Sequence, residues 1–295
     1  YSRKYFGRGK GVVAYTLLCN HIPLNGYLIG TQDYEGHHVF DIWYRNTSGI
    51  VPTTITGDMH SVNKANYAIL HWFGLRFEPR FTDLEDQLKE LYCADDPAQY
   101  ENCLIRPVGQ IDLSVIVDEK PNIDQIVATL GLKEMTQGTL IRKLCTYTAP
   151  NPTRRAIFEF DKLVRSIYTL RYLRDPQIER NVHRSQNRIE SYHQLRSTVA
   201  QVGGKKELTG RTDIEIEISN QCARLIANII IYYNSAILSR LLNRYEASGN
   251  TKTLTLITQM SPVAWRHILM NGHYIFHSDG KMIDLDAIIT GLDFG

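Results

Sequence analysis

The chain has 295 residues, of which 43% are hydrophobic and 22% charged, a composition typical of a soluble globular protein. Its five cysteines are odd in number and show no CxxC spacing, which argues against a disulfide framework and a structural zinc site. The net charge of +2 hides an uneven distribution, because residues 171–211 carry nine Lys or Arg against four acids.

The first eighty residues alternate between strand-like and helix-like patterns, which predicts an α/β sheet layer. The two first strands are expected to be joined by the turn composition Pro-Leu-Asn-Gly at 23–26. The expected elements are strands over 11–22 and 26–30, a helix over 36–47, a strand over 51–58, a helix over 62–73 closed by Gly74, and a strand over 75–79.

Residues 81–174 show a different pattern, with longer helical runs than the segment before them. Proline-bearing breaks at Pro97, Pro121 and Pro150 separate these runs. The pattern predicts a mostly helical insertion between two parts of one fold.

Two long helices are expected to follow. Pro176 in a first turn, behind Asp175 as N-cap, predicts a helix with one apolar face that ends at Gly203-Gly204. Thr212 and Glu215 have capping-box spacing and predict the start of the next helix. That helix runs into an apolar stretch at 225–242, which we interpret as a buried helix because polar residues interrupt it too often for a membrane span.

Two acidic residues stand out by their position in these predicted elements. Glu190 directly follows the apolar Ile189, about 100° round the helix, and is expected at the border of the apolar face. Surrounded by cations, it is either a surface ion pair or a cleft ligand beside a bound polyanion. Asp58 ends a predicted strand and precedes a helix, where a catalytic carboxylate and an ordinary N-cap are equally expected. The residues alone leave both alternatives open.

Two long segments of the sequence are TITGDMHSVNKANYAILHWFGLRFEPR and NRIESYHQLRSTVAQVGGK. Together with two further segments, they resemble the Tn-three family of replicative transposases. The first resembles the segment of the family's second aspartate, and the second resembles its glutamate helix. SPVAWRHILMNGHYIF is similar to the C-terminal signature, and RKYFGRGKGVVAYTL to the segment that leads into the second strand. The resemblance runs from Tyr1 to about Phe276.

This resemblance implies a fold and an acidic site. The family's catalytic domain is ribonuclease H-like, with a DDE triad and a largely helical insertion before the glutamate. Asp58 then matches the second aspartate and Glu190, 132 residues later, the glutamate, and both would hold Mg²⁺ or Mn²⁺. The implied segments are the first part of the core at 1–80, the insertion at 81–174, the glutamate helix and next core helix at 175–245, and a C-terminal segment at 246–295.

The resemblance also implies partners. The chain is expected to bind double-stranded DNA, namely the inverted-repeat ends of a transposon and its target, and to form a homodimer in the full-length protein. We expect a cytoplasmic protein, associated with the nucleoid when bound to DNA and with no membrane attachment. The residues expected to contact DNA phosphates are Arg184, Arg188, His193, Arg196, Lys205, Lys206 and Arg211.

One departure from the family pattern concerns the first aspartate. In the family it lies just upstream of the segment that matches YSRKYFG, and Asp33 and Asp41 follow the second strand, so they cannot replace it. The chain is therefore expected to be inactive alone, as an excerpt of a larger transposase or the product of a truncated gene. A DNA-binding remnant without activity and an unrelated ribonuclease H-like nuclease are the alternatives.

Overall fold

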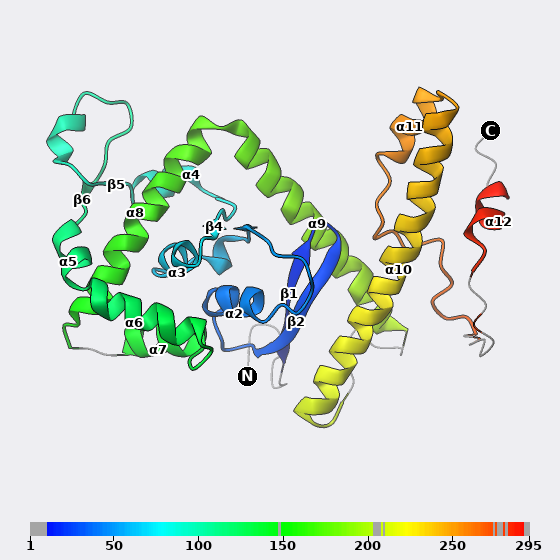
Figure 1. Ribbon diagram of the computed structural model, residues 1–295, viewed down its shortest axis with the longest axis horizontal. Helices are drawn as coiled ribbons and strands as arrows, with labels where there is room; N and C mark the ends of the chain where they lie inside the picture. Colours follow the sequence, from blue (N-terminus) through cyan, green and yellow to red (C-terminus); the bar gives the residue numbers. More distant parts are fainter. Residues whose placement is uncertain are drawn as a thin grey trace. The chain divides into compact units, whose positions relative to one another are not determined.

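The computed structural model describes residues 11–146, 149–202, 208, 210–273, 275, 280 and 283–291. At residue 145 it describes the backbone alone. The chain forms two compact units (Figure 1). The first contains residues up to 17 and residues 24–187, and the second contains residues 18–23 and the chain from 188 onward.

The described part of the chain begins with a hairpin of β1 (Val12–Cys19) and β2 (Ile22–Gly30). Its turn is Asn20-His21, so the turn expected at 23–26 is wrong. Asn20 has a φ of 56°, a left-handed conformation that asparagine tolerates better than most residues. Gly26 lies inside β2, where a Cβ would approach the Tyr15 carbonyl oxygen to 3.2 Å.

The elements that follow the hairpin match their sequence patterns but are shorter. After η1 (Glu35–His38) come α2 (Val39–Tyr44), β3 (Thr54–Ile55), η2 (Met59–Ser61), α3 (Asn66–Trp72) and β4 (Arg76–Phe77). The two strands β3 and β4 pair in parallel. Gly74 closes α3 as predicted, with a φ of 74° and a bond from Leu75 N to Leu70 O at 2.9 Å.

The α/β class is confirmed, whereas the described residues form no extended sheet. They contain three two-stranded sheets, β1–β2, β3–β4 and β5 (Tyr92–Cys93) with β6 (Gly109–Gln110). The ribonuclease H-like sheet therefore stays an implication of the family.

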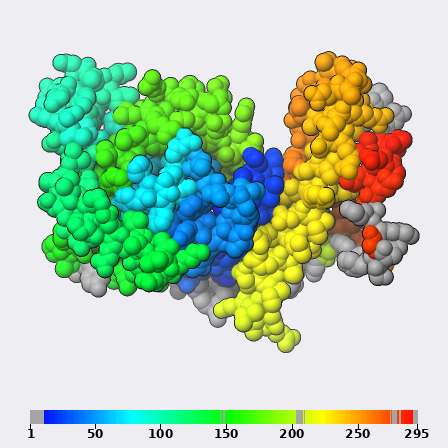
Figure 2. All heavy atoms as spheres, viewed as in Figure 1, coloured from blue at the N-terminus to red at the C-terminus, as the bar shows by residue number. Residues whose placement is uncertain are grey.

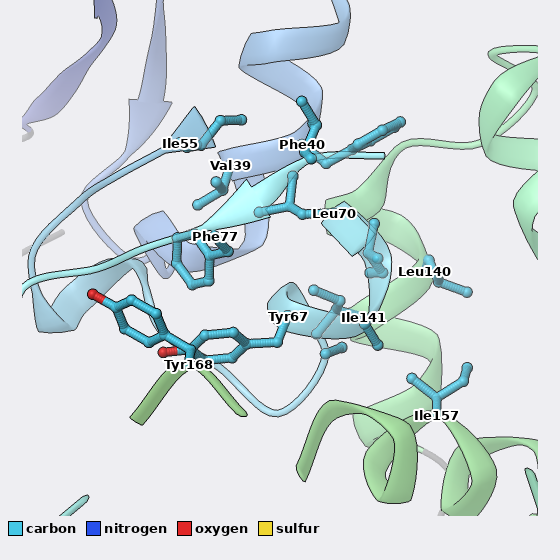
Figure 3. Packing of buried hydrophobic residues seen from close by; sticks show 14 of the residues in the cluster. Val39, Phe40, Ile55, Tyr67, Leu70, Phe77, Leu140, Ile141, Ile157 and Tyr168 are labelled. Carbon is cyan, nitrogen blue, oxygen red and sulfur yellow. The ribbon is translucent and has the colours of Figure 1, made fainter. Parts of the chain in front are cut away.

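Residues 81–174 are mostly helical where the structure describes them, and their role as an insertion stays a prediction. Their elements are α4 (Leu84–Leu88), η3 (Pro97–Tyr100), α5 (Leu113–Asp118), α6 (Lys120–Gly131), α7 (Gln137–Thr146) and α8 (Pro152–Arg174). This segment shares one hydrophobic core with the residues before it, as the packing of Tyr67, Phe77 and Tyr168 illustrates (Figure 3). The helices of 81–174 and the first eighty residues therefore stabilise each other.

Two buried carboxylates join these parts by capping distant helices. Asp41 accepts hydrogen bonds from Gln137 N at 2.8 Å and Gly138 N at 3.3 Å, at the start of α7. Asp161 on α8 accepts from Ala68 N at 3.1 Å, in the first turn of α3. Each satisfies amides that have no partner within their own helix. Burial raises the pKa of Asp161 to about 7, although these amide bonds and Arg165 oppose the shift.

From residue 188 onward, the described residues of the second unit form helices joined by loops. This part contains the end of α9 (Pro176–Gln201), then α10 (Asp213–Ala247), α11 (Thr251–Ile257) and α12 (Leu285–Thr290). The predicted caps are confirmed, because Asp175 accepts from Gln177 N at 2.9 Å and Thr212 forms a capping box with Glu215. The predicted helix end at Gly203-Gly204 lies outside the described residues.

The long helix α10 is buried on one side only. Ala227, Ile230 and Ile231 pack into a core with residues of α9 and with Val263. By length and composition alone, α10 could cross a membrane. Only 28% of its apolar window is buried, which is less than expected for a helix in the core of a protein. The prediction of a buried helix is therefore correct for one face and wrong for the other.

Candidate active site

Asp58 follows directly on a short parallel ladder, at its carboxyl end. The pairing extends beyond the two-residue strands β3 and β4, and its evenly spaced bonds are typical of parallel strands. The bonds run from the N–H groups of Arg76, Glu78 and Arg80 to the carbonyls of Thr53, Ile55 and Gly57, at 3.0, 2.8 and 2.8 Å. Ligands collect at this end of strands in α/β folds.

Asp58 is also the N-cap of η2. Its Oδ1 accepts a hydrogen bond from His60 N at 3.0 Å, and its carbonyl accepts one from Ser61 Oγ at 2.5 Å. Across the described part of the chain, no hydrogen bond reaches Oδ2 of this half-exposed side chain. The N-cap interpretation is therefore correct, and it leaves one carboxylate oxygen for another partner.

Two glycines allow the turns around Asp58 to approach closely. A Cβ on Gly36 would lie 2.6 Å from the Tyr34 ring and 3.1 Å from the carbonyls of both His60 and Ser61. A Cβ on Gly57 would lie 2.4 Å from Ser61 Oγ. Because both residues are glycines, η1 can pack directly against η2, and the residues of both turns lie in one region.

Two asparagines hold η1 in that position. Asn63 and Asn66 both donate to the Gly36 carbonyl, at 2.9 and 2.8 Å. Asn66 also accepts from Gln137 Nε2, whose Oε1 accepts from Phe40 N at 2.7 Å. Asn66 and Gln137 are fully buried, so this network fixes the turn from inside.

This arrangement places a second carboxylate, Glu35, within electrostatic reach of Asp58. Burial, and next the charge of Asp58, raises the pKa of Glu35 above its ordinary value, while His60 opposes the shift. The same two causes raise the pKa of Tyr34, with Glu35 as a third. No spacing in the sequence marks Glu35 as a site residue, because only the packing of η1 on η2 relates it to Asp58.

The donor chemistry of this region fits a hard divalent cation. Asp58 and Glu35 offer carboxylate oxygens, the ligands that Mg²⁺ and Mn²⁺ prefer, and their mutual repulsion favours a cation beside them. The residues that the structure describes contain no group of three or more His, Cys, Asp or Glu placed to hold a metal ion. The region therefore supplies carboxylate oxygens but, among the described residues, no complete set of metal ligands.

Glu190 is exposed on α9, so the expected border position is wrong. The apolar face of α9 is divided between two cores: Val182 belongs to one, and Tyr192 and Leu195 belong to the other. Glu190 lies about 160° round the helix from Tyr192, since each residue turns the helix by about 100°. No ion pair to Glu190 occurs in the described part of the chain. The surface-charge interpretation keeps some support, because the charge of Glu190 acts on the pKa of His193 three residues along α9.

The expected DNA contacts differ in how free they are. Arg184 and Arg211 are exposed, whereas Arg188 is half-buried and donates to Asn20 Oδ1 at 3.0 Å in the hairpin turn. Arg196 is also half-buried. Lys205 and Lys206 lie outside the described residues.

His193 differs from these cations in its protonation. The residue is exposed to solvent, but neighbouring atoms remove part of the water around its ring. This desolvation, and next the charge of Arg196, lowers the pKa of His193 below its ordinary value, while Glu190 opposes the shift. A hydrogen bond to a phosphate is therefore a better expectation for His193 than an ionic contact.

The C-terminal signature packs on α10. The buried Asn234 of α10 donates to the carbonyls of Pro262 and Ala264, at 2.8 and 2.7 Å, and its Oδ1 lies 2.9 Å from His267 Nε2. Val263, between these contacts, is 2% exposed. The described part of this signature therefore has a structural role in the second unit.

Comparison of the sequence with known proteins identifies the family of this chain. The sequence matches the model described as the Tn3 transposase DDE domain over residues 1–274. The chain belongs to this family. It is 25% identical over 293 residues to the transposase for transposon Tn1546 of Enterococcus faecium, covering 96% of this chain and 28% of that protein.

Other relatives give the same result. The transposase for transposon Tn4556 of Streptomyces fradiae is 24% identical over 274 residues, covering 92% of this chain and 30% of that protein. The transposase for transposon gamma-delta of Escherichia coli K12 is 23% identical over 276 residues, covering 93% and 27%. The chain spans less than a third of the length of these relatives. No solved structure matches it.

The resemblance of the four sequence segments is thus confirmed for the family. What this chain does, and whether it uses a metal ion, is the subject of the proposal below. Asp58 belongs to the first unit and Glu190 to the second, and their meeting at one metal stays a prediction.

Proposed function

We propose that this chain is the catalytic-core segment of a replicative DNA transposase. Such an enzyme would cleave the 3′ ends of a transposon's inverted repeats and join them to target DNA. The observation that carries this proposal is Asp58 at the carboxyl end of a parallel ladder, within the matched family segment and with one free carboxylate oxygen.

In this proposal Asp58 and Glu190 are the metal ligands supplied by the described chain. Two bound Mg²⁺ or Mn²⁺ ions would supply activation of water or a 3′-hydroxyl and would neutralise charge on the phosphodiester. Asp58 is fixed through its backbone and Oδ1, so its Oδ2 is presented with little freedom. Glu190, exposed and without an ion pair in the described chain, keeps both oxygens for a ligand.

The basic residues on α9 and after it would hold DNA phosphates. Arg184 and Arg211 are exposed and would make the direct contacts, together with Lys205 and Lys206. Arg188 and Arg196 are half-buried, so we expect them to contribute to the positive electrostatic potential around the site more than to direct contacts with DNA phosphates. A cytoplasmic, nucleoid-associated homodimer is part of the same proposal, as is double-stranded DNA as the partner.

The alternative function is a DNA-binding remnant without activity. Asp41 is buried and accepts hydrogen bonds from the first amides of α7, and Asp33 accepts one from Gly30 N at 3.2 Å in a turn. Neither replaces the first aspartate of the triad. DNA binding without cleavage by a protein that carries the whole triad would favour this alternative.

The decisive experiment changes Glu190→Gln in a transposase that combines this segment with the upstream aspartate strand. The amide keeps the shape but loses the charge that attracts a metal ion, so DNA binding should persist and 3′ cleavage should disappear. Glu179→Gln is the matched control, because Glu179 is an exposed glutamate of the same helix that pairs with His183 at 3.8 Å.

The assay uses a labelled inverted-repeat end with Mg²⁺ or Mn²⁺. The proposal expects cleaved and joined products from the wild type and from Glu179→Gln, and none from Glu190→Gln. Cleavage by Glu190→Gln at the level of the control would remove Glu190 from the site.

A further inference from the structure

A cavity of about 700 Å³ lies along the first half of α8, within the first unit, and is called the α8 cavity. Residues of α5 and β5 supply other parts of its wall, and both elements contact α8 (Figure 1). Figure 2 shows these segments as the blue-green and green atoms at the left of the view. The acids proposed for metal binding, Asp58 and Glu190, do not line this cavity. A cavity of this size is typical of a site that holds one small ligand.

The lining of the α8 cavity has a net positive charge. Five cations and three acids line it, which leaves a net charge of +2. The cations are Lys64, Arg154, Arg155, Lys162 and Arg165, and the acids are Glu90, Glu159 and Asp161. All three acids already have partners in the fold, because Glu90 pairs with Arg165, Glu159 pairs with Lys162 at 2.7 Å, and Asp161 binds an amide of α3. The lining therefore favours a ligand with negative charge.

Three of these cations are placed to hold such a ligand. Lys64 is exposed, and no ion pair reaches it in the described part of the chain. Arg154 donates to the Leu144 carbonyl oxygen at 3.2 Å, which holds its guanidinium group in place. Arg155 pairs with Asp112 at 2.6 Å, but 63% of its side chain is exposed, so water weakens this pair. Because guanidinium groups match the oxygens of a phosphate, these cations fit a phosphate better than a single ion.

The α8 cavity also has apolar and aromatic walls. Val115 of α5 and Phe158 of α8 line it and pack against the hydrophobic core. The Tyr92 ring is held in place, since Lys162 Nζ lies 4.6 Å from its centroid and a Cβ on Gly109 would lie 3.2 Å from its Cε1. Aromatic walls of this kind bind the flat bases of nucleic acids. Cations and aromatic walls in one cavity therefore fit a ligand that has both a phosphate and a base.

Two other kinds of ligand fit the α8 cavity less well. A base pair stacked within a duplex cannot enter it, because proteins that take a base into a cavity first move that base out of the stack. A peptide binds as an added strand or as a helix in a long groove, which needs a longer surface than a cavity of about 700 Å³. A nucleotide outside a duplex has the right size and chemistry.

We propose that the α8 cavity binds a nucleotide outside a duplex, with its phosphate at Lys64, Arg154 and Arg155 and its base against the aromatic walls. The nucleotide is either free in solution or an unpaired nucleotide of a DNA strand, and the groups that recognise it are the same for both. The inference uses only the first unit and does not depend on metal binding by Asp58 and Glu190.

The first test measures the binding of dAMP to the 295-residue chain by equilibrium dialysis, with EDTA present so that no metal ion contributes. Lys64→Gln is the main variant, because Lys64 is exposed and its replacement breaks no ion pair of the described chain. It should raise the dissociation constant about tenfold, the usual effect of losing one charge-assisted hydrogen bond. Arg106→Gln is the matched control, since Arg106 is an exposed cation of the same unit outside the cavity that donates to the Cys103 carbonyl at 3.3 Å. It should leave the affinity unchanged.

Two smaller ligands separate the two parts of the nucleotide. Deoxyadenosine has no phosphate and inorganic phosphate has no base, so each should bind about tenfold or more weakly than dAMP. Arg154→Gln should weaken the binding of dAMP and leave that of deoxyadenosine unchanged, because Arg154 is assigned to the phosphate.

The second test identifies the source of the nucleotide. Two DNA duplexes of the same sequence are compared by anisotropy in EDTA, one fully paired and one with a single unpaired nucleotide. If the nucleotide comes from a DNA strand, the second duplex should bind about tenfold more tightly, and Lys64→Gln should remove this preference. Equal affinities for the two duplexes, together with binding of dAMP, would assign the cavity to a free nucleotide.

Two results would overturn the proposal. One is that neither dAMP nor the unpaired nucleotide binds the wild type more tightly than it binds Lys64→Gln. The other is a hexaglutamate peptide that binds more tightly than dAMP and loses affinity in Lys64→Gln, which would assign the cavity to an acidic peptide. Cleavage by Glu190→Gln would produce neither result, so this inference and the proposed function fail separately.

Discussion

Replacing Asp161 by asparagine should remove a pH dependence from the stability of the first unit. The buried carboxyl has a pKa of about 7, against an ordinary value of 3.8 in an unfolded chain. Between these values the folded protein keeps a proton that the unfolded chain releases. Stability from this group is therefore complete below pH 4 and is lost as the pH rises to 7.

The size of the effect follows from the linkage relation. One proton retained on folding gives a slope of about 1.4 kcal/mol per pH unit. The slope falls off near pH 7, where the folded carboxyl is half ionised, so from pH 5 to pH 7 the wild type should lose about 2 kcal/mol from this group. Asp161→Asn cannot titrate but can still accept from Ala68 N, so its unfolding free energy should lack this loss.

The assay is urea unfolding at several pH values, followed by tryptophan fluorescence. Trp265→Phe in all variants leaves Trp43 and Trp72, which both pack against the core of the first unit. The control is Asp83→Asn, because Asp83 is an exposed N-cap that accepts from Asp86 N at 3.2 Å. The control should follow the wild type. Parallel pH curves for the wild type and Asp161→Asn would refute the reasoning.

Three further predictions test the site and its supports. Gly36→Ala should cost about 1–3 kcal/mol in urea unfolding, because its Cβ would collide with the Tyr34 ring; an unchanged midpoint would contradict the close packing of the two turns. Asn234→Ala should cost about 2 kcal/mol and lower the melting temperature, since it leaves two carbonyls and His267 without a partner; a melt like that of the wild type would argue against this role. Arg184→Ala should flatten the slope of log DNA affinity against log salt by roughly one, and Arg188→Ala by less because Arg188 is bound to Asn20; equal slopes in titrations of both variants would refute the distinction.

Local signals in the sequence predicted the helix ends well. Each of these signals acts within one turn of the chain: the capping box at Thr212, the N-cap at Asp175 and the glycine at 74. The residues that interact are therefore close together in the sequence and can be recognised there. The first hairpin turn was missed for a related reason. A proline and a glycine at 23–26 are typical of a turn, yet Asn20 alone was enough to make one nearby.

The position of Glu190 could not be derived from the periodicity of its helix. A single apolar stripe was expected along α9, whereas Val182 and Tyr192 are buried in different cores. A helix that serves two cores changes its buried face part-way, and the pattern gives only an average direction. An average places Glu190 at a border, while the actual packing leaves it exposed.

The use of each acidic side chain distinguishes the candidates in a way that the sequence cannot. Asp41 and Asp161 are buried and occupied with amides more than ninety positions away, so neither is available to a ligand. Asp58 uses one oxygen for its own turn and keeps the other, and Glu35 is destabilised as an anion beside it. Glu190 has no ion pair in the described chain. A metal ion requires oxygens that the fold has not already used, so Asp58, Glu35 and Glu190 are the acids on which its binding should depend.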